Sequence, residues 1–258
     1  MYVASPQPAV FPGHQPLQFS LARAALHEFY AAAEADAPTM TGMALACAVL
    51  AAGTRPVLWV RHELLDLEAG APYPPGLAEF GIDPTRLTLV RARDAPAALQ
   101  AGLDGARCAA LGAAVIEIRG EAKALDLTAS RRLALAARAS GACVLLARSG
   151  AQPQPSAAET RWHVRSAPSR ALAANAPGNP AFSLSLLRHR GGLAPGQWHL
   201  EWNRDRACFE ETAASGAIAT GSGAPLSLGV VAVSFDRPDR AGDLAARFGE
   251  TAPFRKTG

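Results

Sequence analysis

The chain has 258 residues, of which 49% are hydrophobic and 18% are charged, and its formal net charge is +3. This length and composition predict a globular protein with one large domain or two small ones, long enough to bury a core. No apolar run approaches the roughly 18 residues that cross a bilayer, and the N-terminus has no basic region followed by an apolar one. We therefore expect neither a membrane span nor a signal peptide, and a cytoplasmic location.

Cysteine and histidine give no sign of a metal site. The cysteines are far apart and have no C-x-x-C spacing: Cys47, Cys108, Cys143 and Cys208. The six histidines are scattered, with no H-E-x-x-H arrangement. This pattern predicts scattered, buried free thiols in a reducing compartment, and we expect neither a metal nor another cofactor.

Arginine is concentrated in the middle of the chain. From Arg131 to Arg206, eleven arginines stand against three acidic residues, which gives this segment a net charge of +8. A basic segment of this kind is the part that would meet an anion such as nucleic acid. A solvated arginine-rich surface is the alternative interpretation.

The first 150 residues alternate between strand and helix patterns. Strands are predicted at Leu26–Tyr30, Pro56–Val60, Arg86–Ala92, Ala113–Ile118 and Ala142–Arg148. Helices are predicted at Thr41–Ala52, in a short segment that ends at Gly81, after the N-cap residue Asp94, and at Leu125–Ser140. Strands separated by helices of this length indicate a parallel sheet with helices on both faces.

After this alternation the pattern changes. The segments "TRWHVRSA", "FSLSLLRHR" and "QWHLEWN" alternate apolar and polar residues, which is typical of antiparallel strands at a sheet edge, and "GGLAPG" is expected to be a turn. From about Arg204 the chain is rich in Gly, Ala and Ser, with one hydrophobic island at Leu226–Phe235. We predict a flexible lead-in at residues 1–24, a core domain at 25–203 and a loosely ordered tail at 204–258.

The segment Leu26–Val60 has the element order of a nucleotide-binding unit but lacks its chemistry. A phosphate loop reads G-x-x-x-x-G-K-[ST], with a lysine and backbone N–H groups that hold the phosphates. Residues Ala31–Gly42 have no lysine, and the two lysines of the chain, Lys123 and Lys256, lie far away. The loop also lacks the glycines that let a backbone wrap a phosphate. A conventional ATP site is therefore not expected.

From Leu26 to Asn203 the order of elements resembles the core of RecA. More narrowly, "FGIDPTRLTLVRARDA", "ALDLTASRRLALAARASG", "PSAAETRWHV" and "LLRHRGG…WHLEW" resemble the ImuA family. The resemblance implies an α/β fold with a RecA-like core, a mostly parallel sheet flanked by helices, antiparallel edge strands and a degenerate phosphate loop. It also implies a RecA-like accessory protein of SOS-type DNA-damage mutagenesis, without enzymatic activity, that works with ImuB and an error-prone C-family DNA polymerase in translesion synthesis.

The comparison with RecA also marks the remains of a nucleotide site. These residues are Thr41 and Gly42 in the loop region, Glu63 after the second core strand, and Glu117 at a strand end where RecA has its magnesium-side aspartate. A carboxylate at the C-terminal end of a parallel strand lies where an α/β protein places its site. The alternative for Glu117 is a structural ion pair with a nearby arginine such as Arg119.

Other positions concern binding. Arg148 and Arg161 bound a loop, Ser149–Glu159, in the place where RecA contacts single-stranded DNA, so they are candidates for weak DNA contact. Two arginines and two tryptophans of an edge hairpin are candidates for docking a partner, above all ImuB: Arg188, Arg190, Trp198 and Trp202. The alternative is that both tryptophans belong to the core. Phe19, in "FSLA", fits the F-x-x-A pattern by which RecA-type protomers associate, and implies self-association or contact with RecA.

Two other functions remain open. One is a RecA-like DNA-binding ATPase, which the missing lysine argues against. The other is a SulA-like cell-division inhibitor that binds FtsZ, since SulA is also a RecA-like shell without the phosphate loop. The resemblance to SulA stops near the end of the parallel core, whereas "RWHV", "LLRHRGG" and "WHLEW" fit ImuA.

Overall fold

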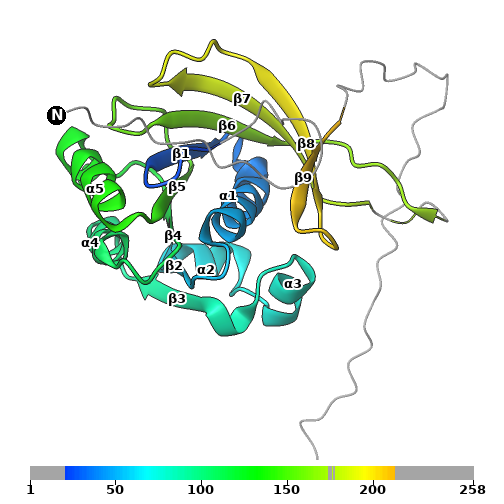
Figure 1. Ribbon diagram of the computed structural model, residues 1–258, viewed down its shortest axis with the longest axis horizontal. Coiled ribbons are helices and arrows are strands. Elements are labelled where there is room, and N and C mark those ends of the chain that lie inside the picture. The colour runs from blue at the N-terminus through cyan, green and yellow to red at the C-terminus, as the bar shows by residue number, and fades with distance from the viewer. Residues whose placement is uncertain (1–20, 174–175, 177, 213–258) are drawn as a thin grey trace, which may run out of the picture. The chain divides into compact units, whose positions relative to one another are not determined.

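A computed structural model describes residues 21–173, 176 and 178–212 of the chain. Phe19 and the island Leu226–Phe235 lie outside this part. The described residues form one nine-stranded sheet in the order β3-β2-β4-β5-β1-β6-β7-β8-β9 (Figure 1). The strands are β1 (Leu26–Ala31), β2 (Val57–His62), β3 (Leu87–Ala92), β4 (Ala113–Arg119), β5 (Cys143–Ser149), β6 (Thr160–Ser166), β7 (Ala181–His189), β8 (Gln197–Asn203) and β9 (Cys208–Glu211).

The sheet is parallel from β3 to β6 and antiparallel from β6 to β9. The prediction of a mostly parallel sheet with antiparallel edge strands is confirmed. One detail of it is wrong: "TRWHVRSA" was expected to be antiparallel, yet β6 pairs in parallel with β1 and is antiparallel only to β7. Strand β6 therefore joins the parallel and antiparallel halves of the sheet. Its alternation of apolar and polar residues indicates which face is buried but not whether the strand pairs in parallel or antiparallel.

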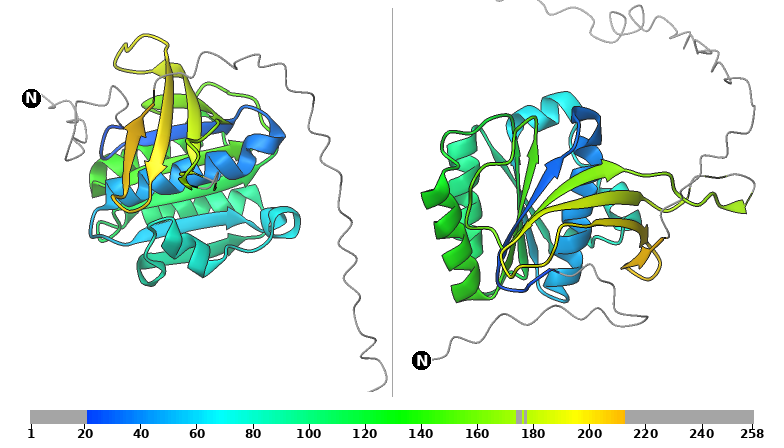
Figure 2. Two further views of the ribbon diagram at one scale, coloured as in Figure 1. Left: turned by 90° about the vertical axis from the view of Figure 1, so that its right-hand side faces the viewer. Right: turned by 90° about the horizontal axis from the view of Figure 1, so that it is seen from above.

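Helices cover both faces of the parallel half. They are α1 (Ala37–Ala52), α2 (Glu63–Ala69), α3 (Pro74–Glu79), α4 (Ala95–Arg107) and α5 (Leu127–Ser140), with short 3-10 turns η1 (Glu34–Asp36) and η2 (Pro84–Arg86). Helices α4 and α5 lie on one face of the sheet and α1 on the other (Figure 2). Asp94 caps α4, as the sequence predicts: its carboxylate accepts the Ala97 N–H at 2.8 Å. Such a cap stabilises a helix by about 1 kcal/mol.

Helix α1 is a core helix. The stretch Glu34–Ala52 is long and apolar enough to cross a membrane, contrary to the expectation that no run approaches that length. In the structure it packs against the sheet instead, and its inward residues Met40, Met43 and Ala44 are fully buried. The end of α1 packs closely against the residue before β4, because that residue is Gly112: a Cβ there would overlap Ala52.

The sheet separates two hydrophobic cores. The core on the α1 face contains seven buried aromatic side chains among the described residues: Phe29, Trp59, Trp162, Phe182, Trp198, Trp202 and Phe209. The core beneath α4 and α5 is aliphatic and includes Leu26, Leu58, Ile116, Leu133 and Val144. Val57, Trp59 and Ile116 are buried, as the strand patterns predict.

The described sheet continues beyond residue 203, where the predicted core domain ends. Strand β9 pairs with β8, and its Phe209 lies in the core with its ring centroid 5.0 Å from that of Trp202. A boundary at 203 would therefore separate a core strand from its partner. Four residues, of which only Phe209 is buried, give too short an alternation to be recognised in the sequence.

His27 is a fully buried neutral group that ties β1 to its surroundings. Its Nε2 lies 2.9 Å from the Ala22 carbonyl, to which it donates, and its Nδ1 lies 2.8 Å from the Thr160 hydroxyl. The Thr160 oxygen accepts the Trp162 indole N–H at 2.7 Å, so its own hydrogen is free to reach Nδ1. Burial lowers the pKa of His27 to about 4, because the charged imidazolium would lose its hydration.

We predict that this histidine makes the fold sensitive to mild acid. An unfolded histidine binds a proton near pH 6.5 and the folded one does so only near pH 4. The contribution of His27 to the free energy of unfolding is thus complete above pH 6.5 and falls as the pH drops towards 4. Urea unfolding at pH 7 and pH 5 should show a loss about 2 kcal/mol larger in the wild type than in His27→Gln. His199→Gln is the control and should behave like the wild type; equal pH dependence in all three proteins would contradict the assignment.

Candidate functional site

A pocket of about 510 Å³ opens at the carboxyl ends of β2 and β4 on the α1 face. Its volume is in the range of small-molecule sites. The lining residues come from the start of α1, from β2, β4, α2 and α3, and from the loop before α3: Glu34, Ala37, Pro38, Thr41, Gly42, Leu45, Trp59, Arg61, Leu65, Ala69, Gly70, Ala71, Pro72, Gly76, Leu77, Phe80, Glu117 and Arg119. Parallel α/β sheets commonly place their sites at this edge.

The carboxylate of Glu117 is fixed by three donors. Its Oε1 accepts the Thr41 hydroxyl at 2.6 Å, and its Oε2 accepts the Trp59 indole N–H at 3.1 Å and the Arg61 Nε–H at 3.2 Å. The side chain is 3% exposed. A buried carboxylate is tolerated only when it is paired and hydrogen-bonded, and both Glu117 oxygens meet this condition.

Arg61, the cationic partner of Glu117, has its other donors occupied as well. Its Nη1 donates to Asp66 at 2.5 Å and to the Gly70 carbonyl at 2.8 Å. Its guanidinium lies 5.5 Å from the centre of the Trp59 ring, which adds a cation–π contact. The same arginine thus holds β2, β4 and the end of α2 together.

The mouth and walls of the pocket differ from its floor. At the mouth, Arg119 lies 3.6 Å from Glu34. The walls are apolar and include Pro38, Leu45, Leu65, Leu77 and Phe80. An apolar or aromatic guest suits such a lining better than a triphosphate, which needs several free cations or N–H groups.

Three N–H groups between β1 and α1 are hydrogen-bonded within the protein. The N–H groups of Ala32, Ala33 and Asp36 donate to Val164 O, Asp36 Oδ2 and Ala33 O. Asp36 also accepts the N–H and hydroxyl of Ser166 at 2.9 and 3.0 Å. Pro38 removes one donor from the first turn of α1. Asp36 and Glu34 thus place two carboxylates where a phosphate loop would receive an anion.

The structure brings together three of the four residues expected at a degenerate nucleotide site. Thr41, Gly42 and Glu117 line the pocket, and the Phe80 ring packs near Gly42, at 3.7 Å from a Cβ built there. Glu63 is exposed on α2 and does not line it, so its assignment to this site is wrong.

The alternative partner of Glu117 is also corrected. Glu117 does form an ion pair with an arginine, but the partner is Arg61, whereas Arg119 lies near Glu34. The register of β2 and β4 sets Arg61 directly beside Glu117. Sequence reasoning missed Arg61 and Trp59 as site residues; the signal available was a charged residue inside a buried strand.

Arg148 and Arg161, the candidates for DNA contact, are buried. Arg161 pairs with the buried Glu28 at 2.7 Å and donates to the Gln154 carbonyl and, at 2.8 Å, to the Ser156 hydroxyl. Arg148 donates to the Gly120 carbonyl at 2.8 Å. The expectation that they hold phosphates is corrected, because both guanidinium groups are buried: Arg161 holds the 149–159 loop from inside, and Arg148 holds the Gly120 backbone.

The edge hairpin separates its tryptophans from its arginines. Trp198 and Trp202 are buried, and Trp202 donates its indole N–H to the Phe80 carbonyl at 2.8 Å. Both are core residues, which corrects their assignment to a partner surface. Arg188 and Arg190 are exposed, and Arg188 reaches the Ser156 carbonyl at 3.1 Å. Of these four side chains, only the two arginines can face a partner without rearrangement.

Other sites are not indicated in the described part of the chain. It contains no group of three or more His, Cys, Asp or Glu residues placed to hold a metal ion. All four cysteines are free thiols; Cys47 and Cys143 are buried as predicted, whereas Cys108 is exposed and Cys208 is only partly buried. Burial raises the pKa of Cys143 to about 12, so this thiol is poorly suited to act as a nucleophile.

The described residues thus define a mixed α/β protein with an apolar pocket at the carboxyl edge of a parallel sheet. No protein-family model matches the chain. It is similar to Protein ImuA from two strains of Caulobacter vibrioides, each 36% identical over 156 residues, which cover 56% of this chain. The alignment spans 59% of the length of these relatives. Over this part of its length the chain is similar to ImuA proteins.

We predict that Glu117 contributes to stability and that Glu63 does not. Glu117→Gln keeps the shape of the side chain but leaves the Arg61 charge buried with one partner fewer, which typically costs about 3 kcal/mol. Glu63→Gln makes the same chemical change on an exposed residue and should change the free energy of unfolding by less than about 0.5 kcal/mol. Chemical denaturation of both variants is the measurement; equal stabilities would refute the buried network.

Proposed function

We propose that the chain is a non-catalytic, RecA-like adaptor of bacterial DNA-damage mutagenesis, acting in the cytoplasm with ImuB and an error-prone C-family DNA polymerase during translesion synthesis. The observation that carries the proposal is the similarity to Protein ImuA. That name supports a role in the mutagenesis accessory system; the partners and the assembly belong to the proposal.

The sheet supports the RecA-like part of this proposal. Strand β1 and the loop that follows it lie inside the parallel half, between β5 and β6, with β4 and β2 beyond β5. The pocket therefore occupies the edge at which a RecA-type protein would bind its nucleotide. Thr41 and Glu117 stand at positions that the resemblance assigns to that site.

The polar contacts of the pocket support an adaptor without ATPase activity. Glu117 and Arg61 bind each other, and Asp36 occupies N–H and hydroxyl donors around the β1–α1 loop. A phosphate would have to displace these contacts and approach two carboxylates. The free-energy cost of breaking these contacts disfavours nucleotide binding. It favours a protein that functions through the binding of partners to its surface.

We predict that ATP with magnesium does not stabilise the fold. A ligand present at 100 times its dissociation constant would add about 2.7 kcal/mol to the free energy of unfolding, a readily detected rise in melting temperature. The expected result is an unchanged melting temperature and no phosphate release, with an active RecA-type ATPase as the positive control. A clear rise with ATP and magnesium would contradict the proposal.

The partner proposal is tested by binding to purified ImuB. We expect a complex, and we expect Arg188→Ala/Arg190→Ala to weaken it at least tenfold, about 1.4 kcal/mol, because exposed arginines are frequent interface hot spots. Arg165→Ala/Arg170→Ala removes two exposed arginines elsewhere and is the matched control. Absence of any complex with ImuB would contradict the proposed partnership. Equal affinity of the two double variants would show only that the hairpin arginines do not contribute to ImuB binding.

A further inference from the structure

Two aromatic side chains line the pocket at the carboxyl edge of β2 and β4, and both are held in place. The Phe80 ring stacks on Trp202, with ring centroids 5.7 Å apart and planes 21° apart. The Phe80 carbonyl also accepts the Trp202 indole N–H at 2.8 Å. Trp59 is fixed in turn by its hydrogen bond to Glu117. Both rings are therefore ordered before any ligand enters, which lowers the entropy cost of binding.

A third aromatic side chain lies at the rim of this pocket. Tyr73 is 70% exposed, and its ring lies 3.4 Å from a Cβ built on Gly76, a residue of the pocket wall. The residue before it, Pro72, lines the pocket as well. The pocket thus offers aromatic surface from its floor to its rim.

The charges that line the pocket balance each other. Two carboxylates, Glu34 and Glu117, stand against two guanidinium groups, Arg61 and Arg119. Glu117 lies 3.2 Å from Arg61, and Glu34 lies 3.6 Å from Arg119. A charged guest would leave water without gaining a counter-charge of its own, which is strongly unfavourable. An uncharged guest breaks neither pair.

The volume of the pocket sets the size of its guest. The pocket measures about 510 Å³, whereas an engineered cavity of about 150 Å³ takes up benzene. Two or three fused rings therefore fit, and a single protein side chain would leave much of the space unfilled. Apolar walls that face an unfilled space lose dispersion contacts. A free molecule of this size suits the pocket better than one side chain of a partner.

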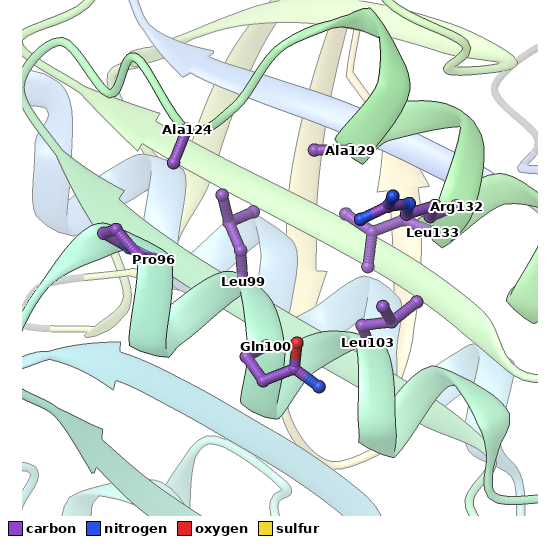
Figure 3. A pocket seen from close by; sticks show the side chains of 8 residues that line it. All are labelled: Pro96, Leu99, Gln100, Leu103, Ala124, Ala129, Arg132 and Leu133. Carbon is purple, nitrogen blue, oxygen red and sulfur yellow. The ribbon is translucent and has the colours of Figure 1, made fainter.

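A smaller hollow between α4 and α5 provides a comparison within the same molecule (Figure 3). It measures about 160 Å³, and Leu99 and Leu103 of α4 and Leu133 of α5 line it. The described residues that line it include no aromatic side chain, and Arg132 borders it. This hollow has neither the ring surfaces nor the volume for fused aromatic rings.

We infer that the pocket at the carboxyl edge is a binding site for a flat, uncharged aromatic small molecule of two or three fused rings. Its rings would pack against Phe80 and Trp59 in the offset or edge-to-face arrangements that aromatic pairs prefer. The aliphatic side chains of Leu45, Leu65 and Leu77 would cover the rest of its surface. Such a ligand is additional to the partners proposed above and does not depend on them.

Binding is measured by amide NMR titration of the full-length chain with 2-naphthol, which is flat and uncharged at pH 7. We expect saturable binding with a Kd of about 1 mM or lower, and shifts centred on α1, α2, α3 and the 70–72 loop. Decahydro-2-naphthol has the same skeleton without aromatic rings and should bind at least about threefold more weakly. 2-Naphthyl phosphate adds an anion and should bind at least about tenfold more weakly.

Three variants locate the site. Gly42→Leu places a side chain in the pocket, because a Cβ at Gly42 lies at an ordinary contact distance, 3.7 Å, from Phe80. Leucine also favours a helix more than glycine does, so we expect at least tenfold weaker binding with no loss of melting temperature. Phe80→Leu keeps an apolar wall without a ring and should weaken binding at least about threefold. Ala129→Leu makes a similar addition at the α4–α5 hollow and should bind like the wild type.

Melting temperatures are checked first, and if Gly42→Leu is destabilised, Phe80→Leu decides. Absence of saturable 2-naphthol binding, unchanged affinity in the folded pocket variants, or shifts centred on α4 and α5 would overturn the inference. So would equal or tighter binding of the saturated alcohol or the phosphate. Binding of N-acetyltryptophanamide without binding of 2-naphthol would assign the pocket to a partner's tryptophan and overturn the assignment to a free ligand. ImuB takes no part in this titration, so the site can fail while the proposed function stands, and the reverse.

Discussion

The buried carboxylate of Glu117 is the constraint on which the parallel half of the sheet and its pocket depend. It joins α1 through Thr41 and β2 through Trp59 and Arg61, while it belongs to β4 itself. Because an isolated buried charge is strongly unfavourable, these elements have to keep their relative positions for the carboxylate to remain paired. The floor of the pocket is thus rigid for structural reasons, and its polar groups are not free to act on a ligand.

The same use of polar groups recurs around the carboxyl edge of the sheet. Asp36 ties the β1–α1 loop to β6, and the Glu28–Arg161 pair holds the 149–159 loop in place. Residues that the resemblance to RecA assigns to nucleotide or DNA contact here hold the fold together. Charge that is free to meet a partner lies on the outside, on α5 and on the β7–β8 hairpin. This division between an internally bonded edge and an exposed charged surface fits the adaptor role proposed above.

Sequence reasoning recovered the strands and helices of the parallel half because hydrophobic periodicity and helix caps such as Asp94 are local signals. Partners of buried charges were harder to predict, since they are distant in sequence: Arg161 pairs with Glu28, 133 positions away. Counting arginines also could not tell buried Arg148 from exposed Arg188. Alternation in β8 indicated one buried face without saying that Trp198 and Trp202 were on it, and the short β9 gave no periodic signal.

The most direct test of the account is a double-mutant cycle on Arg61 and Glu117, with stability measured for Arg61→Met, Glu117→Leu and the combined variant. If the pair is the structural tie described here, each single variant leaves a buried charge and loses about 3–5 kcal/mol. The double variant should then lose at least about 2 kcal/mol less than the sum of the single losses. Strictly additive losses would show that the two side chains do not depend on each other, and would contradict the central role of the Glu117 carboxylate.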